Sequence, residues 1–147
     1  MGIEFDNSKT YLFIAKTLRL AIEMGQPWAI SRGMGGLDQV DILCTVGYSI
    51  KGREQERKGK NAYREHMVPC DLQMREAIRM IKSGSTDEEV ADFFKANNFV
   101  LKISDDEAYL LDVTHGLRTT MPQDWKFGQD VYSRITFANI QLEDNKA

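Results

Sequence analysis

The apolar residues of this 147-residue chain occur only in short runs. The longest, Tyr11 to Ala15, has five residues, and the run from Phe99 to Leu101 is shorter still. A helix that crosses a bilayer needs about 20 consecutive apolar residues, so we expect no membrane span. Glycine, proline and polar capping residues separate the short runs, a pattern typical of several short helices and strands around a small core.

Length and composition indicate one small globular domain. The chain is 42% hydrophobic and 28% charged, which excludes a wholly disordered protein. We predict a single α+β domain over 1–147, mostly helical, with a short antiparallel strand pair. Residues 1–50 form its N-terminal helix and strand region, and 117–147 are expected to be rich in loops. Cys44 and Cys70 are too few for a disulfide scaffold, so we expect reduced thiols and a cytoplasmic protein.

Apolar residues at three-to-four spacing predict helices over residues 8–25, 71–82 and 86–97. Each segment is preceded by a residue that can cap a helix and is followed by glycine or asparagine. A further helix is expected directly after Ser104, because a glutamate three positions on completes a capping box. The candidate capping residues are Asp71, Ser85 or Thr86, and Ser104 with Glu107.

Short apolar or β-branched segments predict strands over 41–50, 63–68 and 99–103, and a short helix or strand within 131–140. Residues 63–68 and 99–103 are too short to stand alone, so we expect them to pair as antiparallel neighbours. The polar run 51–61 contains two glycines and no apolar anchor. It is expected to be an exposed, mobile connection.

The net charge of −3 conceals an uneven distribution. Residues 51–82 carry nine Lys/Arg against five Asp/Glu, whereas 83–112 carry two against eight. A basic segment next to an acidic one suits a metal site near a phosphate backbone, and it equally suits two solvated faces of opposite sign.

Residues 65–69 (EHMVP) place an acid directly before a histidine, followed by two apolar residues and proline. Asn98 precedes the strand at 99–103, and Glu107 follows nine residues later on the capped helix. Over about residues 61–116 this pattern resembles the HNH-type (ββα-metal) endonucleases. It departs from the family in having Glu107 where a histidine is usual, and in two predicted helices between the motifs.

The resemblance implies a metal-dependent endonuclease that hydrolyses phosphodiester bonds in nucleic acid, with DNA favoured. Glu65 and Glu107 would bind Mg²⁺ or Mn²⁺ rather than Zn²⁺, since hard ions prefer oxygen ligands. His66 would take a proton from the attacking water, and Asn98 would orient His66. The residues expected to contact phosphates are Lys58, Lys60 and Arg64.

Two other functions remain open at this level. Small size, acidic character and the missing helix histidine also fit a non-enzymatic inhibitor or interaction protein of a phage or mobile element that binds a bacterial protein partner. Aromatic residues between 125 and 137 suit such an interface. The helix pair 71–82 and 86–97 also resembles a helix-turn-helix unit, although the second helix begins with acids that repel phosphates.

Overall fold

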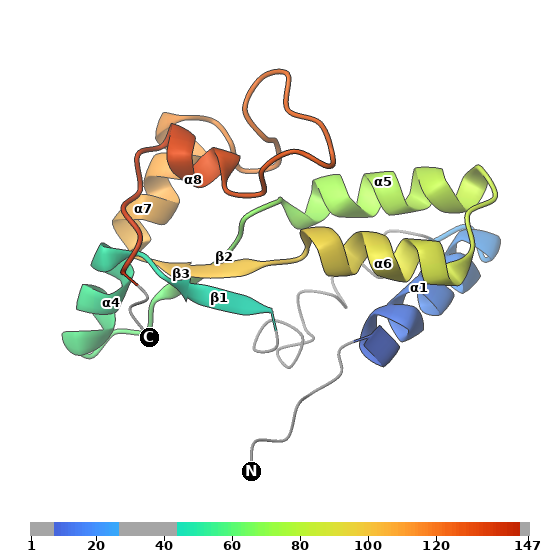
Figure 1. Cartoon of the computed structure of the whole chain (residues 1–147), viewed down its shortest axis with the longest axis horizontal. Helices are drawn as coiled ribbons and strands as arrows, with labels where there is room; N and C mark the ends of the chain where they lie inside the picture. Colours follow the sequence, from blue (N-terminus) through green and yellow to red (C-terminus); the bar gives the residue numbers. More distant parts are fainter. Residues whose placement is uncertain (1–7, 27–43, 145–147) are drawn as a thin grey trace, which may run out of the picture. The chain divides into compact units, whose positions relative to one another are not determined.

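A computed structural model describes residues 8–26 and 44–144 of the chain (Figure 1). Its helices and its three-stranded mixed sheet make an α+β protein, as predicted. The described residues group into two compact units, each assembled from separated segments. The first unit contains residues 8–26 and 70–98, and the second contains residues 44–69 and 99–144. None of the described helices has the length and apolar character needed to cross a membrane.

The first unit consists of helices α1 (Ser8–Glu23), α5 (Cys70–Lys82) and α6 (Asp87–Asn97). The three predicted helices are therefore confirmed, with ends that differ by two residues or fewer. The helices lie side by side and bury the apolar stripes that predicted them (Figure 1). The fully covered side chains of this core are Tyr11, Ala15, Leu18, Met74, Ala77, Val90 and Phe94.

The helix ends of this unit follow from local residues. Gly25 adopts φ +76° after α1, and the amide of Gln26 donates to the carbonyl of Ala21 at 2.8 Å, which closes the helix. Thr86 caps α6 in a full capping box with Glu89. The prediction of Asp71 as an N-cap is wrong. Helix α5 already begins at Cys70, and the Asp71 carboxylate accepts a hydrogen bond from Arg75 Nε at 2.9 Å.

The second unit contains the sheet of strands β1 (Thr45–Tyr48), β2 (Tyr63–His66) and β3 (Val100–Ile103), in the order β1-β3-β2. Strands β2 and β3 are antiparallel neighbours, which confirms the predicted pair. Strand β1 lies within the segment predicted at 41–50, of which residues 41–43 are outside the described part. It runs parallel to β3, a pairing that the sequence did not predict.

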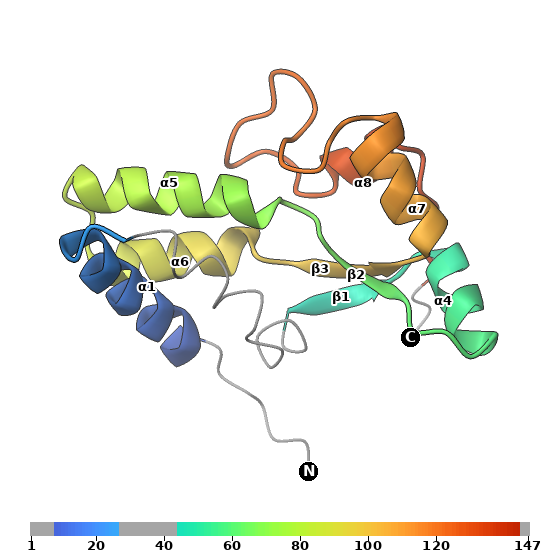
Figure 2. The same cartoon turned by 180° about the vertical axis from the view of Figure 1, so that it is seen from behind.

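Helix α7 (Asp105–Tyr109), the π-helix η1 (Leu110–Thr114) and helix α8 (Ser133–Phe137) follow β3 in the second unit. Both views place α7 and α8 on the same face of the sheet (Figures 1 and 2). The predicted capping box of Ser104 and Glu107 is confirmed, and α8 falls within 131–140 as expected. The buried residues shared by the sheet and these helices are Met67, Leu101, Ile103, Ala108, Leu111, Ile135, Ala138 and Ile140.

The prediction of a mobile connection at 51–61 is wrong for residues 51–57, because Ile50–Arg57 form helix α4, whereas residues 58–61 form an exposed connection to β2. Ser49 caps this helix by accepting a hydrogen bond from the Gly52 amide at 2.9 Å. Gly52 is buried against β3, where an added Cβ would lie 2.5 Å from the Lys102 carbonyl oxygen. This glycine permits a helix to pack closely on a strand. In the sequence alone the same glycine is typical of a helix breaker, because its role depends on tertiary contact.

Candidate functional site

Glu65 and His66 are adjacent on β2 and face opposite sides of the sheet, since successive side chains of a strand alternate. Glu65 pairs with Leu101 of β3 and is buried on the side covered by α7 and α8. His66 pairs with Val100 and is half-buried on the other side. The two residues of the EH motif are therefore not directed at one common point.

The carboxylate of Glu65 has a buried cationic partner in Arg134, which belongs to α8 and is fully covered. Arg134 Nη1 lies 2.9 Å from Glu65 Oε1 and also donates to the carbonyl oxygen of His66 at 2.8 Å. Nη2 donates to the carbonyl oxygen of Leu117 at 2.6 Å. Arg134 thus connects the end of β2 to the loop after η1. Sequence reasoning missed it, because nothing local links position 134 to position 65.

Burial raises the pKa of Glu65 above its ordinary value of 4.5, while the charge of Arg134 acts in the opposite direction. A carboxyl whose pKa is raised by folding binds its proton more tightly in the folded protein. The stabilisation linked to that proton is complete below pH 4.5 and is lost as the pH rises through the folded pKa. We therefore expect the free energy of unfolding to fall over this window relative to that of Glu65→Gln.

Urea unfolding of the wild-type protein and Glu65→Gln at several pH values between 4 and 7 measures this difference. The variant removes the titrating group, so the other carboxylates contribute equally to both curves. A difference that stays constant, or that grows in favour of the wild type as the pH rises, would contradict the raised pKa.

Glu107 is also buried, and its carboxylate accepts two hydrogen bonds. Oε1 accepts from the Ser49 hydroxyl at 2.5 Å and from the Ser104 backbone amide at 3.0 Å. The first bond joins α7 to the residue after β1, and the second is half of the capping box. Glu107 therefore holds the start of α7 next to the residue that follows β1.

Asn98, predicted to orient His66, is the C-cap residue of α6 and belongs to the first unit. Its Nδ2 donates to the hydroxyl of Tyr11 at 3.1 Å, in the core formed by α1 and α6. This contact gives Asn98 a structural role within the helical unit.

A divalent ion held by Glu65 and Glu107 would need carboxylate oxygens that converge on one point. Here the Glu65 carboxylate forms an ion pair with Arg134, and the Glu107 carboxylate accepts hydrogen bonds from Ser49 and Ser104. Among the residues that the structure describes, no group of three His, Cys, Asp or Glu side chains is placed to hold a metal. The side chains in this arrangement do not fit the predicted metal ion.

Two of the predicted phosphate contacts already have acidic partners. Lys58 Nζ lies 3.1 Å from Glu54 Oε1, one turn earlier in α4, and Lys60 forms an ion pair with Asp105. Both lysines line an open depression between α4 and the start of α7, together with Lys51, Gln55, Ser104 and Asp106. A phosphate there would have to compete with these carboxylates.

The third predicted contact, Arg64, lies in a row of residues that crosses the sheet. Arg64 of β2 is the register partner of Lys102 of β3, and Lys102 is the register partner of Tyr48 of β1. These three side chains face away from the core beneath α7 and α8, since they alternate with Leu101 and Ile103. Like charges directly opposite each other on an antiparallel pair are destabilising. The sequence did not reveal this row, because it depends on the register of three strands.

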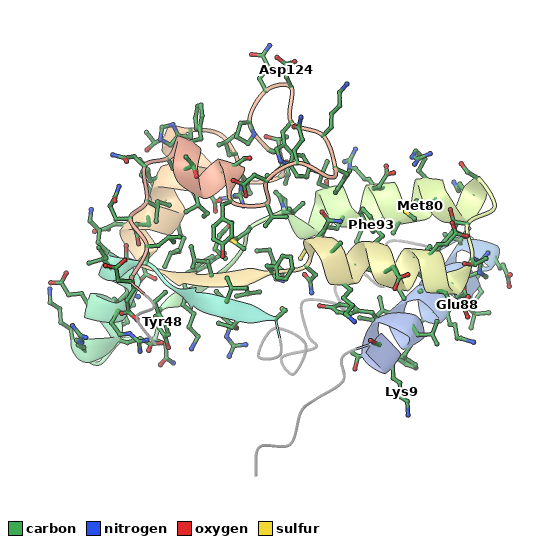
Figure 3. The ribbon with its side chains drawn as sticks, viewed as in Figure 1. Lys9, Tyr48, Met80, Glu88, Phe93 and Asp124 are labelled. Carbon is green, nitrogen blue, oxygen red and sulfur yellow. The ribbon has the colours of Figure 1, made fainter. Side chains whose placement is uncertain are left out.

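The aromatic ring of Tyr48 organises two cations of this face, which we call the basic sheet face: Tyr48, Arg53, Arg64 and Lys102. Tyr48 lies beside α4 (Figure 3), and the Arg53 guanidinium carbon is 3.6 Å from its ring centroid. Lys102 Nζ donates to the Tyr48 hydroxyl at 3.1 Å, and this hydroxyl donates to Glu56 at 2.8 Å. Cation–π contact and hydrogen bonding together hold Arg53 and Lys102 in defined positions.

No protein-family model, no curated protein and no solved structure matches this chain.

Proposed function

We propose that the second unit binds nucleic acid through the basic sheet face. The observation that carries the proposal is the register of Arg64 directly opposite Lys102, with Tyr48 in the same row. Cations from two neighbouring strands at one position of the sheet concentrate positive charge, and such a surface attracts the phosphates of a polyanion. Arg53, stacked on Tyr48, extends the same basic face.

Phosphate contacts give affinity without reading sequence, and this is the binding that such a face supports. Facing side chains of an antiparallel strand pair have Cβ atoms about 4.5–5.5 Å apart, so two long basic side chains at such a position can reach neighbouring phosphates of one nucleic-acid strand. Single-stranded or locally opened DNA is therefore the substrate class to test first. Glu56 and Glu143 lie near Lys102 and Arg53 and limit the net charge of the face.

Replacing Arg64 and Lys102 with glutamine should weaken binding of a fluorescein-labelled 20-nucleotide single-stranded DNA and lower its log–log salt slope by about two, one per lost phosphate contact. Fluorescence anisotropy over a series of NaCl concentrations measures both quantities. The matched control is Lys58→Gln with Lys60→Gln, which removes the same charge from two lysines that line a different depression, beside α4 and the start of α7.

Equal losses in the two double variants would mean that only net charge matters, which would count against a specific face. If the wild-type protein binds neither single-stranded nor duplex DNA at low salt, the proposal fails. The interaction protein with a protein partner then becomes the leading hypothesis.

Cleavage of nucleic acid is a second candidate function, favoured by the chain order of the second unit. Strand β2, its antiparallel neighbour β3 and the contacting helix α7 follow the strand–strand–helix order of the family that the sequence resembles. The positions of Glu65 and Glu107 argue against it. The same DNA incubated with Mg²⁺, Mn²⁺ or EDTA tests it. Metal-dependent cleavage that is lost in a folded His66→Ala variant would establish an endonuclease.

A further inference from the structure

The last described residues of the chain lie beside the C-terminal end of strand β1. The Ile50 amide donates to the Gln141 carbonyl at 2.9 Å, and the Glu143 amide donates to the Tyr48 carbonyl at 3.0 Å. Ser49 and Leu142 form an isolated antiparallel bridge between these bonds. The segment follows α8 and ends beside α4 (Figure 2). Two backbone hydrogen bonds thus hold Gln141–Glu143 next to the basic sheet face.

This position brings the Glu143 carboxylate onto Arg53 in a two-pronged contact. Arg53 Nε lies 2.9 Å from Oε2, and Nη2 lies 3.0 Å from Oε1. The hydrogen bond to Arg53 is the main cause of the lowered pKa of Glu143, and the same bond is the main cause of the raised pKa of Arg53. Both directions agree that the charged forms stabilise each other.

Solvent reaches the pair, since the side chains of Arg53 and Glu143 are 35% and 29% exposed. An ion pair with this exposure contributes little to stability. The two residues line an open depression with Arg57 and Glu56, and the charge of Arg57 also lowers the pKa of Glu143. Two arginines and two carboxylates therefore line a place that a ligand can enter, and Glu143 is the carboxylate that holds Arg53 in a two-pronged contact.

A guanidinium fork binds a carboxylate and a phosphate with the same two-pronged geometry. A phosphodiester also carries one negative charge, as a carboxylate does. We infer that Arg53 and Arg57 form a phosphodiester-binding site at the end of the basic sheet face, and that the Glu143 carboxylate occupies this site when no nucleic acid is bound. This inference rests on the proposed function and adds to it a site and an internal competitor.

Glu143→Gln tests the competition directly, because the amide keeps the size of the side chain and removes its charge. We expect this variant to bind the 20-nucleotide DNA about fivefold more tightly than the wild type, the effect of freeing one exposed ion pair. Its salt slope should rise by about one, because Arg53 gains a phosphate contact. The matched control is Glu54→Gln, which also removes one negative charge. Glu54 lies on α4 and pairs with Lys58.

A gain in Glu143→Gln that is absent in Glu54→Gln, and that disappears when Arg53→Ala is added, supports the site. Equal affinities of the two single variants, in a protein that does bind DNA, would overturn the inference and leave the proposed function standing. If no variant binds DNA, the proposed function fails, and pyrophosphate tests the site by itself. Pyrophosphate should shift the Arg53 Nε–H NMR signal at a lower concentration in Glu143→Gln than in the wild type. Identical titrations would overturn the inference.

Discussion

Arg134→Met is expected to lower the free energy of unfolding by about 3–5 kcal/mol, the cost of removing one partner of a buried ion pair. The variant leaves the Glu65 carboxylate buried without its cation, and it removes the hydrogen bonds from Arg134 to the carbonyl oxygens of His66 and Leu117. Methionine fills part of the space, so the loss measures charge and hydrogen bonding more than a cavity. Urea unfolding followed by circular dichroism gives the value.

Arg118→Met is the matched control, because Arg118 is 71% exposed and lies 3.6 Å from Asp112. We expect it to change stability by less than about 0.5 kcal/mol. The double variant Glu65→Leu with Arg134→Met removes both charges and should recover much of the loss, which keeps the test informative if the single variant does not fold. A loss in Arg134→Met no larger than that in Arg118→Met would show that the buried pair is unimportant.

Two effects of Gly52→Ala on the free energy of unfolding oppose each other, and the sign of the measured change shows which is larger. In a helix interior, alanine is favoured over glycine by about 1 kcal/mol. At Gly52, however, the new Cβ would lie 2.5 Å from the Lys102 carbonyl oxygen and 2.9 Å from Ile103 Cα, both of which are backbone atoms. Overpacking of this kind lowers the free energy of unfolding by about 1–3 kcal/mol. Because β3 is the central strand, we expect Gly52→Ala to lose stability by an amount near the upper end of this range.

Gly59→Ala provides the comparison, since a Cβ there meets nothing within 4 Å but the residue has φ +93°. We expect Gly59→Ala to lower the free energy of unfolding by about 1 kcal/mol, which reports only the unfavourable backbone conformation. Thermal unfolding of both variants distinguishes steric conflict from backbone strain. If Gly52→Ala raises the melting temperature, α4 does not pack on β3 as described.

Most of the helices and the three strands could be predicted because their signals are local. Capping boxes join residues three positions apart, as at Thr86 with Glu89 and Ser104 with Glu107. The apolar stripe of α1 needs only its own periodicity. Strands β2 and β3 lie in short segments that need a neighbour for their backbone groups, so their pairing could be predicted as well.

The environment of the candidate site residues depended on contacts between distant positions. Glu65 is paired with a residue 69 positions later in the chain, and Glu107 bonds to Ser49 across 58 positions. The sequence identified both acids and could not show that each has a structural partner. The metal ion and the nuclease activity stay predictions from the EH motif.

The basic sheet face illustrates the same division between local and tertiary information. The sequence by itself determined the helical and strand segments, their caps and the basic character of residues 51–82. Only the tertiary structure decided that Ile50–Arg57, which contain Gly52, fold as helix α4. It also decided that Tyr48, Lys102 and Arg64 form one row across the sheet. Helix and strand signals arise from neighbours along the chain, whereas close packing and strand register bring together residues that no local pattern relates.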